Sequence, residues 1–131
     1  MILRTGVDIV EITRLETVNP AIRERFIKRV FTPLEIELSR GRYESLAGRF
    51  AAKEAVSKAL GTGIGWVPWQ DIEIRRGKWG EPILALHGRA RMVSDRLGLT
   101  VWSVSISHGR EYAVATATGL GEGSEPGELA R

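Results

Sequence analysis

The 131-residue sequence contains no cysteine, which excludes a disulfide framework, an iron–sulfur cluster, a cysteine-bound zinc site and a thiol nucleophile. Only two histidines are present, His87 and His108, so we do not expect a histidine-rich metal site. No apolar run approaches the roughly 18–20 residues that a membrane span needs, and the amino-terminal residues do not read as a secretion signal. The length and composition therefore predict one domain, located in the cytoplasm.

Acidic charge is concentrated at the carboxyl end. Residues 119–131 contain four glycines, three glutamates, one proline and one arginine, and this composition predicts a disordered tail. The remaining domain, residues 1–118, carries 18 basic and 13 acidic side chains, a net charge of +5. This basic domain favours an anionic partner but does not identify it.

Hydrophobic patterning predicts an α+β fold in which helices pack on a largely antiparallel sheet. Asn19 before Pro20 predicts a helix start, and Ile22, Phe26 and Val30 predict its buried stripe. A capping-box pattern at 32–35 starts the next helix. The expected strands are 2–10, 70–76, 82–86, 100–107 and 111–118, and the expected helices are 20–30, 33 to about 40, 45–60 and 87–97.

Asp8 is an unusual residue for its position. It lies within an otherwise apolar strand, where a buried carboxylate is costly unless it is paired or bound to a cation. Gly6, two residues earlier, lies on the same face of the strand and leaves space there. A carboxylate at a strand end, facing water or bonded to a backbone amide, explains Asp8 equally well.

The helix expected at 45–60 carries several charges and ends in a glycine-rich loop. Glu54 and Lys58 are spaced as an i, i+4 pair, which usually forms a weak surface salt bridge. Gly61, Gly63 and Gly65 follow, and such a loop either presents backbone N–H groups to phosphates or simply ends the helix in a turn. The loop matches neither a Walker A motif nor a dinucleotide-binding fingerprint.

His108 follows a serine at the end of a predicted strand, a pair that suggests a hydrolase. Neighbouring residues of a strand point to opposite faces, so we do not expect Ser107 and His108 to bond to each other. The sequence also lacks a nucleophile elbow. A structural histidine is the simpler interpretation of His108 from these residues alone.

Taken in order, several motifs resemble one known family. They are GVDIVE (6–11), GRFAAKEA (48–55), SKALGTGIG (57–65), DIEI (71–74), GEP (80–82), VSISH (104–108) and YAVA (112–115). Together they resemble the 4′-phosphopantetheinyl transferases, of the short bacterial holo-[acyl-carrier-protein] synthase type. The resemblance covers about residues 3–118, so the predicted tail lies outside it.

The resemblance implies a fold, an activity and an assembly. Family members move the 4′-phosphopantetheine arm of coenzyme A onto a serine of an apo acyl carrier protein and release adenosine 3′,5′-bisphosphate. Their short members are trimers with active sites between subunits. A short chain that joins a metal, coenzyme A and a carrier protein needs no nucleophile of its own, because the carrier protein supplies the serine.

The resemblance also assigns residues to roles. Asp8 and Glu54 would hold Mg²⁺, and together with Lys58, which would reach the phosphates, they form the expected catalytic set. Either Glu54 or a metal-bound water would act as the base. Arg49 and His108 would bind the phosphates of the nucleotide, and the glycines of the loop would line the coenzyme A cleft: Gly61, Gly63 and Gly65.

Basic side chains are the expected contacts with the acidic carrier protein. The candidates follow the first strand: Arg14, Arg23, Arg25, Lys28 and Arg29. The family usually has another arginine for the 3′-phosphate of coenzyme A, and both Arg40 and Arg42 fit that role.

Two other functions compete with the transferase. One is a non-catalytic domain that binds coenzyme A or a carrier protein. The other is a nucleic-acid-binding module, which is disfavoured because the aromatic residues are not interleaved with the basic ones. We therefore expect no nucleic-acid or membrane partner.

Overall fold

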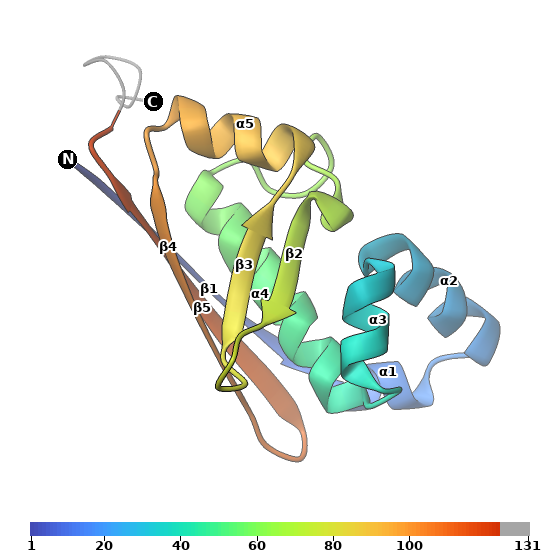
Figure 1. Ribbon diagram of the computed structural model, residues 1–131. Helices are drawn as coiled ribbons and strands as arrows, with labels where there is room; N and C mark the ends of the chain where they lie inside the picture. Colours follow the sequence, from blue (N-terminus) through green and yellow to red (C-terminus); the bar gives the residue numbers. More distant parts are fainter. Residues whose placement is uncertain (124–131) are drawn as a thin grey trace.

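A long first strand and a long last strand frame the chain, and the computed structural model describes residues 1–123 (Figure 1). The elements in order are β1 (Ile2–Glu11), α1 (Ile12–Thr17), α2 (Pro20–Val30), α3 (Pro33–Ser39), α4 (Tyr43–Leu60), the 3-10 helix η1 (Trp69–Asp71), β2 (Ile72–Arg76), β3 (Pro82–Leu86), α5 (Gly88–Arg96), β4 (Val101–His108) and β5 (Tyr112–Gly121). In this part of the chain no helix is long and apolar enough to cross a lipid bilayer.

Two antiparallel sheets enclose the longest helix. One sheet has the strand order β1-β5-β4, and the other is the β2–β3 hairpin. Helix α4 runs between them, while α1, α2 and α3 gather at one end of the molecule (Figure 1). The predicted α+β class and the largely antiparallel pairing are therefore confirmed.

Small residues allow α4 to lie close to the first sheet. A Cβ atom on Gly6 of β1 would overlap the carbonyl oxygen of Ala55 in α4. Ala51, Ala55 and Ala115 are fully or almost fully buried in this contact. The backbones approach so closely that a side chain at position 6 would overlap α4. Glycine at this position therefore allows α4 to pack directly against β1.

The predicted helix boundaries follow from local capping. The Asn19 side chain accepts a hydrogen bond from the Ala21 N–H at 2.9 Å, and Thr32 and Glu35 form the reciprocal capping box. Gly61 ends α4 in the left-handed conformation, with φ of 80°. Each of these signals was readable in the sequence, and each is confirmed.

Some details differ from the sequence-based expectations. Helix α1 was not expected, because it is short and its N-cap, Glu11, makes no side-chain capping bond. Residues 70–71, expected in a strand, belong to η1. Ile22 was expected to be buried, and it is 49% exposed instead, on a surface described below.

Strand β5 extends into the segment that we predicted as a tail. Its last residue, Gly121, pairs with Ile2 of β1, so the domain boundary predicted at residue 118 is too early. A close backbone contact explains why residue 121 is a glycine, since a Cβ on Gly121 would overlap the carbonyl oxygen of Gly98. Residues 124–131 of the predicted tail lie outside the described residues.

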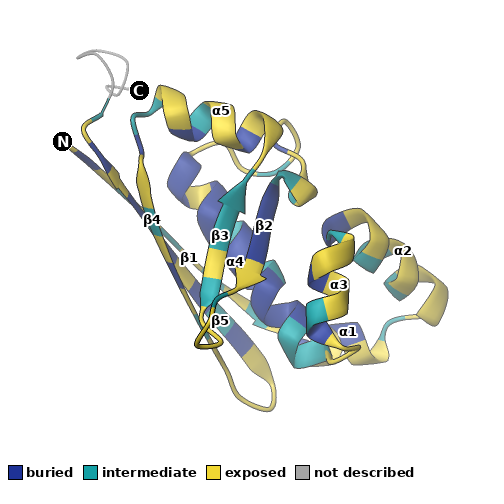
Figure 2. Cartoon of the chain, in the orientation of Figure 1, coloured by how far each residue is buried: buried dark blue, intermediate teal, exposed yellow. Residues whose placement is uncertain are grey.

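The larger sheet has one covered face and one open face. Helix α4 covers one face, and none of the described helices lies on the other (Figure 1). Exposed apolar residues of β1 lie on this open face, among them Leu3 and Ile9, each 62% exposed. Figure 2 shows exposed stretches along the strands of this sheet. An apolar sheet face of this kind is more often an interface than a free surface.

Candidate functional site

Strand β1 and helix α4 bring the three expected catalytic residues together. The Lys58 ammonium lies 3.1 Å from Oδ1 of Asp8 and donates a hydrogen bond to the Val7 carbonyl at 3.0 Å. Glu54 lies one helical turn before Lys58 on α4. We call Asp8, Glu54 and Lys58 the carboxylate cluster.

The charges within the carboxylate cluster affect one another. Burial raises the pKa of Glu54, and the nearby Asp8 carboxylate raises it further, while Lys58 opposes both effects. Bringing a cation to two such carboxylates would relieve their repulsion. At sites where it also contacts phosphate, Mg²⁺ usually binds one or two carboxylates of the protein. Asp8 and Glu54 supply two. No group of three or more metal-ligating side chains occurs within residues 1–123, so the remaining ligands would be water and substrate oxygens.

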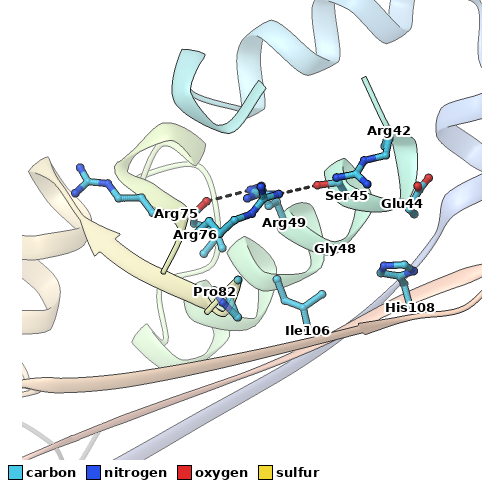
Figure 3. Close-up of a pocket in the computed structure, with 12 residues that line it drawn as sticks. Arg42, Glu44, Ser45, Gly48, Arg49, Arg75, Arg76, Pro82, Ile106 and His108 are labelled. Atoms are coloured by element: carbon cyan, nitrogen blue, oxygen red, sulfur yellow. Dashed lines mark hydrogen bonds between the residues drawn. The ribbon is translucent and has the colours of Figure 1, made fainter. Parts of the chain in front are cut away.

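A second group of charges lines a pocket of about 290 Å³ between α4, the β2–β3 hairpin and β4 (Figure 3). We call it the arginine pocket. Its lining includes one carboxylate, Glu44, and five basic residues: Arg42, Arg49, Arg75, Arg76 and His108. This excess of positive charge matches an anionic ligand.

Arg49 is built into the wall of the arginine pocket. It is only 7% exposed; its Nε donates to the Ile74 carbonyl at 3.0 Å and its Nη1 to the Ser45 hydroxyl at 2.7 Å. Burial lowers the pKa of Arg49; Glu35 opposes this, and the charges of Arg76 and Arg42 lower it further. A bound anion would offset the repulsion among these guanidinium groups.

The carboxylate cluster and the arginine pocket lie on opposite flanks of α4. Arg49 and Lys58 are nine positions apart in the helix, which places them about 180° apart at about 100° per residue. Asp8 and His108 likewise belong to β1 and β4, the two edge strands of the larger sheet. One chain therefore does not bring all the predicted site residues into one cavity.

The glycine loop lies at the carboxyl end of α4, apart from the arginine pocket. Gly61, Gly63 and Gly65 all have positive φ, at 80°, 65° and 133°, and none of them lines that pocket. The guanidinium group of Arg4 lies against Gly61. The expected role of these glycines in the coenzyme A cleft stays a prediction.

An apolar groove of about 440 Å³ extends from the carboxylate cluster toward α1 and α2. Ile22, Phe26 and Phe50 line it together with Glu54, which explains why Ile22 is exposed. Of the residues predicted to bind the carrier protein, two line this groove, Arg14 and Arg23.

The other predicted carrier contacts lie beside the groove. Arg25 and Lys28 are exposed on α2 outside the groove lining, and Lys28 forms an ion pair with Glu24 at 3.1 Å. Arg23 donates hydrogen bonds to the carbonyls of Leu15 and Glu16, each at 3.2 Å. Arg23 therefore holds the end of α1 in place in addition to lining the groove.

Sequence reasoning missed the role of two basic residues. Lys53, in the middle of the family motif, is fully buried and pairs with Glu35 at 2.8 Å, and it lines neither the arginine pocket nor the apolar groove. Arg76 was not singled out, although Ile72 and Ile74 place it on the inward face of β2 by the two-residue period of a strand. Of the two arginines left open, Arg42 lines the arginine pocket and Arg40 does not.

Comparison with known proteins gives the family. A family model described as the 4′-phosphopantetheinyl transferase superfamily matches residues 4–117. The chain belongs to this superfamily. Among curated relatives, the transferase is 48% identical to the holo-[acyl-carrier-protein] synthase of Moorella thermoacetica, over 95% of this chain and 99% of that protein. It is 45% identical to the synthase of Desulforudis audaxviator, over 92% and 95% of the two chains.

Solved structures agree with the fold of the transferase. The Helicobacter pylori holo-[acyl-carrier-protein] synthase in complex with coenzyme A has a TM-score of 0.80 and 35% identity, covering 88% of this chain and 99% of that one. The Bacillus anthracis synthase, in complex with coenzyme A (3′,5′-ADP), has a TM-score of 0.71 and 37% identity, with 93% and 96% covered. The expected family and fold are thereby confirmed.

Proposed function

We propose that this transferase moves the 4′-phosphopantetheine group of coenzyme A onto a serine of an apo acyl carrier protein. The serine oxygen bonds to the phosphorus that carries pantetheine, and the bond from that phosphorus to the nucleotide breaks. Adenosine 3′,5′-bisphosphate leaves with the bridging oxygen and the electron pair. The observation that carries this proposal is the carboxylate cluster of Asp8, Glu54 and Lys58.

The carboxylate cluster would serve the pyrophosphate. Asp8 and Glu54 would hold Mg²⁺, which when bound neutralises the charge of the pyrophosphate. Lys58 is half exposed and can turn its ammonium from Asp8 toward a phosphate oxygen. Either Glu54 or a metal-bound water would accept the serine proton.

The arginine pocket would hold the nucleotide end of coenzyme A. Arg49 is fixed by hydrogen bonds to Ile74 and Ser45, and Arg42 and His108 complete a wall of basic side chains. Between the two arginines that fit the 3′-phosphate in the sequence, the pocket favours Arg42 over Arg40. Gly61, Gly63 and Gly65 stay predicted contacts of the coenzyme A cleft.

A complete site would be formed between copies of the chain. The carboxylate cluster and the arginine pocket lie on opposite flanks of α4, so one coenzyme A molecule would use the cluster of one copy and the pocket of the next. The open apolar face of the larger sheet, with Leu3, Val7 and Ile9, offers the contact between copies. We therefore propose a homotrimer with interfacial active sites.

The apolar groove would receive the carrier protein. Arg14 and Arg23 lie beside an apolar floor that includes Ile22 and Phe26, which suits an acidic helix with one apolar side chain pointing inward. The groove ends at Glu54, so a docked carrier would present its serine to the carboxylate cluster. Arg25 and Lys28 would extend the positive surface along α2. We predict that the protein acts in the cytoplasm.

A transfer assay tests the proposed function. The protein is incubated with coenzyme A, Mg²⁺ and an apo acyl carrier protein, with and without a chelator, and the mass of the carrier is measured. We expect the carrier to gain one phosphopantetheine group, and the chelator to prevent this. Absence of modification with several carrier proteins would contradict the proposal, and binding of coenzyme A without transfer would favour the non-catalytic alternative.

A further inference from the structure

Two adjacent arginines of β2 point to opposite faces of the strand. Ile72 and Ile74 are buried against α4, so the two-residue period of a strand places Arg76 on the same inward face. Arg75 points the other way, and its Nε donates to Oε1 of Glu73 at 2.9 Å. Figure 3 shows Arg76 beside Arg49 in the arginine pocket, while the Arg75 side chain extends away from it.

Arg76 is held in the pocket but keeps donors for a ligand. Its Nη2 donates to the Leu38 carbonyl at 3.1 Å, and no other hydrogen bond to its side chain occurs among the described residues. Arg49, in contrast, already donates from Nε and Nη1. A guanidinium group has five N–H donors in a planar fork, so Arg76 can still offer several of them to one phosphate.

The positive charges around Arg76 favour one type of phosphate group as the ligand. Arg76 and Arg42 both lower the pKa of Arg49 through their charges, which means that the Arg49 guanidinium group repels those of Arg76 and Arg42 when no anion is bound. A phosphomonoester carries up to two negative charges on one group, and arginine forks bind such a group in bidentate fashion. The pocket therefore suits a terminal phosphate.

Coenzyme A has only one phosphate of this kind, the 3′-phosphate of its ribose. Its other two phosphates form the pyrophosphate, where the bond breaks, and under the proposed function they lie at the carboxylate cluster. We infer that Arg76 contacts the 3′-phosphate of coenzyme A and sets the preference for coenzyme A over dephospho-coenzyme A. This inference rests on the proposed function and adds a specificity-determining residue to it.

Nucleotide binding tests the inference without the carrier protein. Calorimetric titration measures the affinity for adenosine 3′,5′-bisphosphate and for adenosine 5′-monophosphate, and the ratio of the two reports recognition of the 3′-phosphate. We expect Arg76→Gln to lower this ratio about tenfold or more, since a charge-assisted bond is lost. Arg96→Gln removes the same charge at an exposed residue of α5 that does not line the arginine pocket, and it should leave the ratio unchanged.

Two further measurements complete the test. In the transfer assay, Arg76→Gln should raise the KM for coenzyme A while kcat is kept, and Arg76→Lys should restore part of the lost ratio. Thermal unfolding establishes that each variant is folded. If Arg76→Gln weakens both nucleotides equally, or leaves the ratio intact, the inference is wrong and the proposed function stands. If the wild type binds neither nucleotide nor coenzyme A, both are wrong.

Discussion

Lys53 and Lys58 lie on the same helix, five positions apart, and their surroundings give them different roles. Lys53 is enclosed by Glu35 and by the carbonyls of Trp69 and Ile72, so all three of its N–H donors are satisfied inside the protein. Lys58 remains half exposed beside Asp8. Residue type and motif alone do not separate the two, because burial is a property of the folded chain.

Asp8 is the residue whose removal tests the carboxylate cluster most directly. We expect Asp8→Asn to lower the transfer rate at least about 100-fold, because it removes one of two expected metal ligands. The fold should survive, since Asp8 is partly exposed and its side chain bonds only to Lys58 among the described residues. The carrier mass assay gives the rate, and thermal unfolding gives the stability. Full activity in this variant would contradict the assigned role.

The lowered pKa of Glu73 predicts that the stability of the fold depends on pH. Burial alone would raise the pKa of Glu73, but hydrogen bonds from Thr32, His87 and Arg75 outweigh it and hold the pKa below its ordinary value. A carboxyl group with a lowered pKa stabilises the fold above its unfolded pKa of about 4.5, and this contribution is lost as the pH falls through the folded value. Glu73→Gln should therefore cost stability near neutral pH and progressively less in acid.

Denaturant unfolding at a series of pH values measures this effect. The difference in unfolding free energy between the wild type and Glu73→Gln should shrink as the pH falls below about 4.5. Glu24→Gln is a matched control, since Glu24 is exposed on α2 and pairs only with Lys28 among the described residues. A gap that stays constant with pH would show that Glu73 does not contribute through its charge.

The buried pair of Lys53 and Glu35 connects three elements. Glu35 closes the capping box of α3 and accepts a hydrogen bond from the Ile74 N–H of β2 at 2.8 Å, while Lys53 belongs to α4. Burial lowers the pKa of Lys53, and the charge of Glu35 opposes this. The pair thus fixes the helices near the apolar groove to the strand that carries Arg76.

Removing one partner of this pair should be costly. We expect Lys53→Met to lower the unfolding free energy by about 3–5 kcal/mol, because it leaves the Glu35 carboxylate buried without its cation. The double variant Lys53→Met/Glu35→Gln should recover part of the loss. Urea unfolding of the wild type, both single variants and the double variant gives the coupling energy. A coupling near zero would mean that the pair does not join these elements.

Local signals explain how far the elements were predictable. Caps at Asn19, Thr32 and Gly61 lie next to the residues that they control, so the helix ends were readable. Helix α1 has no such signal, and the outward position of Ile22 depends on the groove beside it. The helical spacing of Arg49 and Lys58 in the sequence is by itself enough to place these residues on opposite flanks of α4.

The division of the site between two flanks is a property of the whole molecule. In the sequence, the resemblance assigned Asp8, Glu54, Lys58, Arg49 and His108 to active sites that lie between subunits. The residues form two groups with suitable chemistry, and the three-dimensional arrangement separates these groups within a chain. Only an assembly of copies would bring the two groups together.

Mixing two inactive variants tests this division. Asp8→Asn removes the carboxylate cluster, and Arg42→Ala/His108→Ala weakens the arginine pocket through exposed residues. If sites form between copies, mixed assemblies contain some sites with an intact cluster and an intact pocket. We expect unfolding and refolding the two variants together to restore part of the activity, whereas mixing them only at the assay step restores less. Equal inactivity in both mixtures would contradict shared sites.

A variant on the open face of the larger sheet tests whether copies of the chain assemble through this face. We expect Leu3→Glu to shift the protein toward monomers and to lower the transfer rate with it, because a charge on an apolar interface is costly to bury. Light scattering after size-exclusion chromatography gives the molar mass. Met92→Glu, at a partly exposed apolar residue of α5, is the control and should change neither property. An unchanged mass for Leu3→Glu would place the contact between copies elsewhere.

If the site is shared between copies as proposed, this small transferase would be sensitive to its own abundance. At high dilution the chains would separate by mass action, and each would then hold one half of a site on each flank of α4. Specific activity would fall with dilution even though every chain stays folded. A newly synthesised chain would stay inactive until it meets others, so carrier modification would rise more steeply than expression of the transferase.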